Sequence, residues 1–449
     1  MSSPHHAAVS LDDEEKAENI GSLNFNLFGL EEFEQPASVK HEPTGHVAIP
    51  HEGGKQAWLT VAGSSCAMFV SFGWANCIGL FQAEYESNEL KDYSTGQVSW
   101  ITSMSFFFLL FCSPLSGKLF DSYGPRVPIL LGSFMHVFGL MMTSLSSKYY
   151  QIMLSQSVCS GIGCSLIFTP AMSAPYTYFH KKRAIAGGLT VAGSSLGGVI
   201  FPIMVQHLLA DIGFPWTMRA CAFMILGLLV ISNLFIRSAM KHTPKPFHIM
   251  DYVRPMTELK FVLICIGSFF LYWGMFVPLD YIVTEAQHYG ASTYLALSLV
   301  PILNGASFVG RTVPNYFADK VGRFNLMIGM SILSTVLVLG LWLPGRGHSA
   351  FICFAVFFGI SSGACVGLGP VLIASVSPIK ELGTRMGTVF AIASGASLSS
   401  APIAAAIVAD DGGSYRFAAV FSGVNFFLAT ICLCILRGCI AGWAVNANV

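Results

Sequence analysis

One cation lies deep within a long apolar segment of the chain. Arg311 follows Val309 and Gly310 within the segment 293–316. A guanidinium group keeps its proton, so inside a membrane it must face a cavity, a carboxylate or backbone carbonyls. Arg311 is therefore a candidate contact for an anionic substrate. Two other roles stay open, a structural ion pair and a side chain that reaches the membrane surface.

Other polar side chains lie in apolar segments as well. Asp280, near the end of the segment 261–283, could carry a proton if it is partly buried, or it could lie among lipid headgroups. At helical spacing, Asn76 and Gln82 lie near one face of the first segment. That face suits a solute cavity, but interhelical hydrogen bonds would also explain it. The candidate substrate contacts are therefore Arg311, Asn76, Trp74, Gln82 and Asn304.

A short pattern occurs twice in the chain, each time between two long apolar segments. Each copy places a carboxylate three residues before a glycine, with a basic residue one or two positions further on. Such a distant repeat predicts that two similar membrane halves are joined head to tail, as in secondary transporters. The copies are Gly117, Asp121, Gly124 and Arg126, and Asp319, Gly322 and Arg323.

The sequence contains no recognisable catalytic or metal-binding constellation. It lacks a phosphate loop ending in Lys-Ser/Thr, a His-Glu-x-x-His pair and a Gly-x-Ser-x-Gly elbow. We therefore predict no catalytic residue, no metal site, no cofactor and no nucleic-acid partner. The lack of a nucleotide-binding domain argues against an ATP-driven pump, so energy would come from a gradient.

Composition predicts the elements that must position these residues. The chain is 53% hydrophobic and 11% charged, whereas a soluble chain carries roughly 25% charged residues. A membrane span needs about 20 apolar residues, and polar breaks divide the chain into twelve such segments. We predict an all-α integral membrane protein with twelve spans in two pseudo-symmetric six-helix bundles. The spans are 58–82, 96–116, 128–145, 151–176, 184–209, 217–236, 261–283, 293–316, 326–344, 350–374, 385–408 and 417–437.

The flanking segments complete the predicted organisation. With a cytoplasmic N-terminus, most of the 24 Lys and Arg residues fall on the cytoplasmic side, which fits the positive-inside rule and puts both termini in the cytoplasm. The acidic start of the chain has little apolar sequence and predicts disorder. The predicted parts are a tail 1–56, an N-terminal bundle 57–236, a central loop 237–260, a C-terminal bundle 261–437 and a C-tail 438–449.

The first copy of the repeat resembles the loop signature of the major facilitator superfamily, Gly-x-Leu-x-Asp-x-x-Gly-x-Arg. In that family the Asp caps a helix of the other half and pairs with Arg, which closes the cytoplasmic side. The resemblance implies that the seven repeat residues form an inner gate. It also implies that Asp121 lies at the N-terminus of the helix that starts near Arg385.

Further stretches resemble the fungal branch of the monocarboxylate porter family. They lie at 53–58, 76–82, 178–184 and 192–198, and Val309-Gly310-Arg311 is similar to that family's substrate-binding arginine motif. Two positions depart from the animal lactate carriers, because Asn76 and Ser307 stand where those carriers have Lys and Asp. The departures argue against lactate–proton symport.

The resemblance implies a secondary active transporter that works by alternating access. We expect it to export a fungal secondary metabolite, and the alternative is proton-linked uptake of a monocarboxylate or related organic acid. A more distant alternative is a nutrient sensor that transports nothing. The expected partners are a small organic solute, protons and the lipid bilayer, around a monomeric protein. We expect it in the plasma membrane, with the vacuole or another endomembrane as the alternative.

Overall fold

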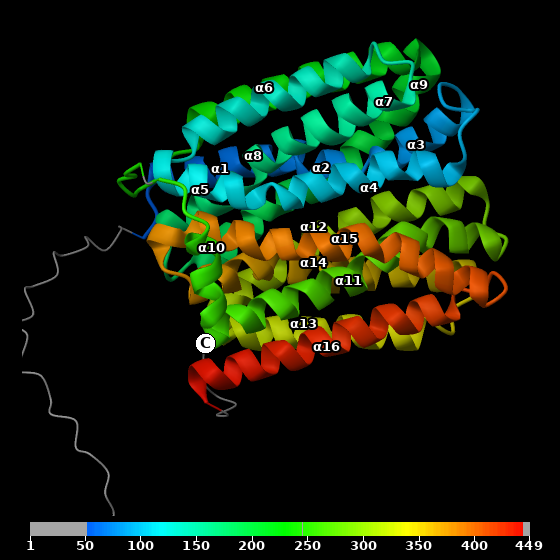
Figure 1. Ribbon diagram of the computed structural model, residues 1–449. Coiled ribbons are helices and arrows are strands. Elements are labelled where there is room, and N and C mark those ends of the chain that lie inside the picture. The colour runs from blue at the N-terminus through cyan, green and yellow to red at the C-terminus, as the bar shows by residue number, and fades with distance from the viewer. Residues whose placement is uncertain (1–51, 245, 443–449) are drawn as a thin grey trace, which may run out of the picture. The chain divides into compact units, whose positions relative to one another are not determined.

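The computed structural model describes residues 52–244 and 246–442, which fold almost entirely into long helices (Figure 1). Within a bilayer, every backbone N–H and C=O must find a partner inside the protein, and a helix provides these partners locally. The long apolar segments therefore become helices. Residues 1–51 of the predicted acidic tail and residues 443–449 of the predicted C-tail lie outside the described residues.

The first half of the described chain forms six spans, several of them built from more than one helical piece. In Figure 1 they make up the blue, cyan and green group of helices. The pieces are α1 (Lys55–Val70), α2 (Phe72–Ala75), α3 (Ile78–Ser87), α4 (Thr95–Phe111), α5 (Ser113–Tyr123), α6 (Arg126–Thr143), α7 (Tyr149–Ile152), η1 (Met153–Ser160), α8 (Gly161–Ser173), η2 (Pro175–Thr177) and α9 (Arg183–Phe235).

A short linker and a second group of six spans follow. In Figure 1 the second group runs from green to red and lies beside the first. Its elements are α10 (Met250–Val253) and η3 (Arg254–Thr257) in the linker, then α11 (Leu259–His288), α12 (Thr293–Val321), α13 (Arg323–Leu337), η4 (Val338–Trp342), α14 (His348–Val376), η5 (Ile379–Glu381), α15 (Leu382–Asp410) and α16 (Arg416–Ala441).

The 53-residue helix α9 contains two spans. Eleven helical stretches of the described residues are long and apolar enough to cross a membrane, with α9 counted once. Within α9, Gly213 has φ 72° and ψ 171°, a conformation that breaks the helical path and that glycine adopts easily. The two parts of α9 bring the number of spans to twelve, which confirms the predicted fold.

The first span is interrupted twice. Ser71, between α1 and α2, has φ −94° and ψ −79°, and its hydroxyl donates to the Ala67 carbonyl at 2.7 Å. A serine that bonds back to the preceding turn bends a helix. A second interruption follows at Asn76 and Cys77, before α3 begins. The side chains of α2 and α3 therefore do not continue the helical faces of α1.

Candidate functional site

Asp121 joins the two halves of the protein at one end of the helices. It lies in the last turn of α5 and caps the N-terminus of α15. Its Oδ1 accepts from the Gly383 N–H at 2.9 Å, and its Oδ2 accepts from the N–H and hydroxyl of Thr384 at 2.8 and 2.7 Å. A carboxylate fits this position because the N-terminus of a helix presents free N–H groups and the positive end of its dipole. We call this contact the α15 cap.

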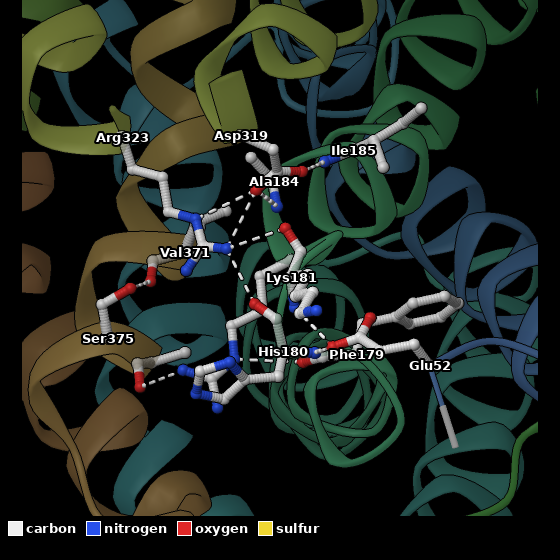
Figure 2. Close-up of polar contacts among 12 residues, drawn as sticks. Glu52, Phe179, His180, Lys181, Ala184, Ile185, Asp319, Arg323, Val371 and Ser375 are labelled. Atoms are coloured by element: carbon white, nitrogen blue, oxygen red, sulfur yellow. Dashed lines mark hydrogen bonds and ion pairs between the residues drawn. The ribbon is translucent and has the colours of Figure 1, made fainter. Parts of the chain in front are cut away.

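Asp319 makes the matching contact from the second half (Figure 2). It lies near the end of α12 and accepts from the N–H groups of Ala184 and Ile185, at the start of α9, at 3.1 and 3.2 Å. Arg323 donates to the same carboxylate through Nε at 3.0 Å. We call this contact the α9 cap. The two halves thus cap each other's helices through the two acidic residues of the repeat.

The remaining residues of the repeat fall into two groups. Gly124 and Gly322 end α5 and α12 with φ 78° and 107°, a conformation that favours glycine after a helix. Arg323 also donates to the carbonyls of His180 and Lys181 at 2.8 and 3.1 Å (Figure 2). The repeat therefore combines helix ends with cross-half hydrogen bonds.

Arg126 differs from Arg323 in its contacts. It begins α6 and is exposed, and no ion pair with it occurs among the described residues. The pairing of the first motif's Asp with Arg that the resemblance implied is therefore not part of this arrangement.

Glycines let the halves approach closely next to both caps. A Cβ added to Gly117 would lie 1.9 Å from the Gly383 carbonyl oxygen. A Cβ on Gly387 would lie 2.3 Å from the Ser113 oxygen, and one on Gly188 would lie 2.3 Å from the Arg311 oxygen. Any side chain at these positions would push the backbones apart, so the caps depend on these glycines.

The α15 cap is covered by the linker between the halves. Lys118 pairs with Asp251 of α10, and the Tyr252 hydroxyl donates to the Pro114 carbonyl at 3.1 Å. The His242 ring lies 3.1 Å through Nδ1 from the Asp121 carbonyl oxygen. The linker thus contacts α5 at three residues, so a movement of α5 would also displace the linker.

Arg311 is buried between α12 and α9, with 4% of its surface exposed. Its Nη1 donates to the Val191 carbonyl at 3.0 Å and to the Ser194 hydroxyl. Its Nε is buried without a hydrogen-bond partner, and none of the described carboxylates pairs with it. A buried cation with a free donor and no counter-ion is a suitable contact for an anionic ligand.

Asn304 lies on the same helix and also faces α9. It is buried, its amide donates to the Val300 carbonyl at 3.1 Å, and a Cβ on Gly198 would lie 2.6 Å from its Oδ1. Arg311 and Asn304 therefore lie along one interface between the halves.

The three candidates of the first span make their aromatic contacts and hydrogen bonds with residues of the first half. Trp74 is 1% exposed and packs against the rings of Phe81, His136 and Phe201, all within the first half. Its indole N–H has no partner among the described residues. The ring is therefore surrounded by other spans of its own bundle.

Asn76 and Gln82 make local hydrogen bonds. The Asn76 amide donates to the Phe72 carbonyl at 3.0 Å. The Gln82 amide donates to Glu86 at 2.9 Å, and its oxygen accepts from the Thr102 hydroxyl at 3.3 Å. Both side chains are half-buried, and neither contacts Arg311 or Asn304 in these hydrogen bonds.

Asp280 is exposed on α11 and lies beside Ser400 of α15.

Among the described residues, no three His, Cys, Asp or Glu side chains are grouped so that they could hold a metal ion.

Comparison with known proteins identifies the family. The family model described as Major Facilitator Superfamily matches residues 63–358. The chain belongs to the Major Facilitator Superfamily. As a member, it is a multi-pass membrane transporter for small organic molecules and not an enzyme.

Relatives within the superfamily align over most of their length. The chain is 65% identical over 398 residues to "MFS-type transporter opdF" of Penicillium oxalicum, covering 89% of this chain and 94% of the relative. It is 43% identical over 380 residues to the "Fujikurins efflux protein" of Gibberella fujikuroi, covering 84% and 82%. It also resembles the structure of the superfamily transporter FucP in the outward conformation, at TM-score 0.65 and 14% identity over 85% of this chain and 99% of that one. The likeness to FucP shows the superfamily fold.

Two acidic residues near the caps were missed in the sequence. Glu52 precedes α1 and accepts from the backbone N–H groups of His180 and Lys181 at 2.8 and 2.5 Å (Figure 2). Glu258 precedes α11 and accepts from Nη2 and Nη1 of Arg385 at 2.6 and 2.7 Å. Each lies just outside a predicted span, where an acidic residue next to an apolar segment was the only signal.

A third acidic residue was missed because α11 is longer than predicted. Glu285 is 5% exposed and accepts from the indole N–H of Trp342, which lies on the π-helical turn η4. The predicted span ended at 283, whereas α11 continues to His288. Glu285 is therefore a buried carboxylate within the second half, and among the described residues it forms no ion pair.

Proposed function

We propose that this protein exports a small organic product of fungal secondary metabolism by alternating access. The caps carry the mechanism, because each half holds the N-terminus of a helix in the other half through an Asp. Rocking one half against the other opens one end and must break both caps together. The caps therefore stabilise one of the two states that transport requires.

The proposal assigns the capped end to the cytoplasm. Most basic residues flank the spans on that side, and positive charge favours the cytoplasmic face. The seven residues of the repeat then act as the inner gate. With the gate closed, the solute path opens away from the cytoplasm, which is the direction of release for an exporter.

The efflux direction is supported by the relatives. The Gibberella fujikuroi relative is an efflux protein for fujikurins, and the Emericella nidulans relative is an efflux protein for aspyridones. We carry the class of solute over to this protein and not the individual compounds. We propose the plasma membrane as its location and a monomer as its working form.

Metabolite profiling of medium and cells tests this function. The gene is deleted in one strain and overexpressed in another, and Asp121→Asn serves as the transport-impaired variant. Export predicts a compound that the deletion strain retains and that the medium gains on overexpression. Slower consumption of a medium compound by the deletion strain would instead identify an importer.

Arg311 favours a second candidate function, proton-linked uptake of a monocarboxylate. The guanidinium is buried without a carboxylate partner among the described residues, as a carboxylate-binding site requires. In this case Asp280 carries the proton, and the protein belongs to the monocarboxylate porter branch. Uptake of a labelled monocarboxylate that rises with external acidity, and that Asp280→Asn makes independent of pH, would support it.

A further inference from the structure

Six aromatic side chains form a closed circuit across the two halves of the protein. Each ring lies within 6.3 Å, between centroids, of the next ring in the circuit. The contacts are Phe72–Phe106 at 6.0 Å, Phe106–Phe276 at 5.8 Å, Phe276–Tyr272 at 6.0 Å, Tyr272–Phe390 at 6.3 Å, Phe390–Phe168 at 5.0 Å and Phe168–Phe72 at 5.8 Å. We call these six residues the ring circuit.

The ring circuit is divided evenly between the halves. Three of its rings come from the first half, on α2, α4 and α8, and three come from the second half, on α11 and α15. Only two of the six contacts cross between the halves, Phe106–Phe276 and Phe168–Phe390. When the halves separate, these two contacts open and the others stay within one half. The ring circuit can therefore part into two aromatic walls that face each other.

The ring circuit lies within the membrane-spanning part of the protein. Tyr272 lies 13 residues into α11, about 20 Å along the helix at 1.5 Å per residue. Five of the six rings are at most 7% exposed, and Phe106 is partly buried. Rings that served only to anchor helices in the lipid would face outward, as Phe134 and Phe138 of α6 do.

Arg311 lies at about the same depth along the helices as Tyr272 of the ring circuit. Tyr272 lies 16 residues before the end of α11, and Arg311 lies 18 residues after the start of α12, so they lie about 24 and 27 Å from the neighbouring ends of these two consecutive helices. Tyr272 is also the circuit member with a polar group. The Nε of Arg311 is buried and has no hydrogen-bond partner among the described residues. One site therefore offers flat apolar walls and a charged hydrogen-bond donor beside them.

We propose that the ring circuit and Arg311 form one binding site for organic acids with a planar ring system. The planar ring inserts between the aromatic walls of the two halves, where offset stacking and edge contacts are favourable. The acidic group of the ligand accepts hydrogen bonds from Arg311. This inference rests on the proposed function and adds the chemical class of the exported solute.

The test measures binding of two acids to the purified full-length protein in nanodiscs. The probes are 9-anthracenecarboxylate, which has a planar ring system, and cyclohexanecarboxylate, which does not. We expect the native protein to bind the anthracene acid at least tenfold more tightly. Phe168→Leu and Phe106→Leu should weaken anthracene-acid binding about threefold to tenfold, the range that an aromatic pair contributes. Both variants should weaken cyclohexanecarboxylate binding less than twofold, so the preference for the anthracene acid falls.

Two controls accompany these variants. Phe138→Leu removes an exposed ring outside the ring circuit and should change neither affinity. Tyr272→Phe keeps the ring and should preserve the preference for the anthracene acid. Should Phe168→Leu fail to fold, as judged by gel filtration and melting temperature, the partly buried Phe106→Leu decides the question alone.

The remaining outcomes overturn the inference. Equal affinity for the two acids, no measurable binding of either, or ring variants that weaken both acids equally would mean that the rings only seal the interface.

The proposed function fails separately. If metabolite profiling shows no export while the acids bind as expected, the site stands and the direction of transport is wrong. If export is shown and the acids do not differ, only this inference is wrong.

Discussion

The two caps have the same backbone arrangement, but the residue eight positions before the capping Asp differs between them. Ser113 lies eight residues before Asp121, and Arg311 lies eight residues before Asp319. The carbonyl of each faces a glycine of the other half at the same distance from an added Cβ, 2.3 Å. The Ser113 hydroxyl bonds within its own half, to the Leu109 carbonyl at 3.2 Å and to the Ser165 hydroxyl at 3.4 Å, whereas the Arg311 guanidinium crosses to the other half. Residues that support the fold are thus repeated in both halves. The positive charge that we assign to ligand binding is present in the second half only.

The caps also differ in how many side chains hold the halves together. At the α15 cap, Asp121 is the carboxylate that receives all three cross-half hydrogen bonds. At the α9 cap, Arg323 reaches the carbonyls of His180 and Lys181 as well, and Arg183 reaches the Ala374 carbonyl at 3.1 Å. The α9 cap therefore retains cross-half contacts when its Asp is lost, and the α15 cap depends on one residue.

Around the caps, the largest effect is expected from adding a methyl group where the backbones touch. Gly117→Ala places a Cβ 1.9 Å from the Gly383 oxygen, so α5 and α15 must move apart and Asp121 loses its donors. Such overpacking costs about 1–3 kcal/mol or more. We expect export to fall more than tenfold. Spin labels at the exposed residues Tyr123 and Lys380 should also move apart.

Gly227→Ala is the matched control, because a Cβ there meets nothing within 4 Å. Alanine also favours helix over glycine by about 1 kcal/mol, so this variant should fold and transport normally. An unchanged label distance in Gly117→Ala would contradict the close approach of the two helices.

The second effect distinguishes the two caps. Asp121→Asn replaces a carboxylate that accepts from three donors, and hydrogen bonds to charged groups contribute about 1.5–3 kcal/mol each. We expect about tenfold slower export from Asp121→Asn and about threefold slower export from Asp319→Asn, measured as initial rates in vesicles. Asp410→Asn, at the opposite end of α15, is the control and should keep the native rate. Equal losses at the two caps would show that Arg323 and Arg183 do not support the α9 cap.

A third variant removes the difference between Ser113 and Arg311. Arg311→Ser gives the second half the residue found at Ser113 of the first half. Because the cap next to it keeps its own residues, we expect the protein to fold with nearly native stability. Export of an anionic solute should fall about a hundredfold, and a neutral solute should be affected less than threefold. If both solutes are lost equally, Arg311 is a structural residue.

Much of the fold could be predicted from the sequence, because the hydropathy of a segment indicates whether it lies mainly in an apolar or a polar environment. Twelve apolar segments predicted twelve spans, and Gly213 divides α9 between two of them. The motif of Asp121 located a helix cap, since a carboxylate near a helix end has few better partners than free N–H groups. Its role as a gate stays a prediction.

The candidate site was harder to predict, since periodicity shows which residues share a face but not what that face meets. Trp74 was grouped with Asn76 as a solute contact, yet it packs inside the first half. The interruption at Ser71 changes the direction of the faces that follow it. The ring circuit left no local signal, because its members lie on five different spans that only the folded chain brings together.

The smallest effects concern the acidic residues that support each cap from outside the spans. The hydrogen bond from Arg385 lowers the pKa of Glu258 below its ordinary value of 4.5. At Glu52, burial opposes ionisation, but the backbone N–H groups of Lys181 and His180 outweigh it and the pKa is again lowered. A lowered pKa in the folded protein means that the carboxylate stabilises the fold above its ordinary pKa. That contribution is lost as the pH falls through the folded-state pKa.

We therefore expect Glu258→Gln to destabilise the protein by about 0.2–1 kcal/mol, as for other partly exposed ion pairs, and Glu52→Gln by less. The stability difference between Glu258→Gln and the native protein should stay constant from pH 8 to about pH 5, because Glu258 remains charged throughout. The stability difference should shrink only below pH 4.5, the ordinary pKa of a glutamate side chain. Thermal unfolding of both proteins across this range measures it. A difference that already disappears between pH 7 and pH 5 would mean that another group near the caps titrates together with Glu258.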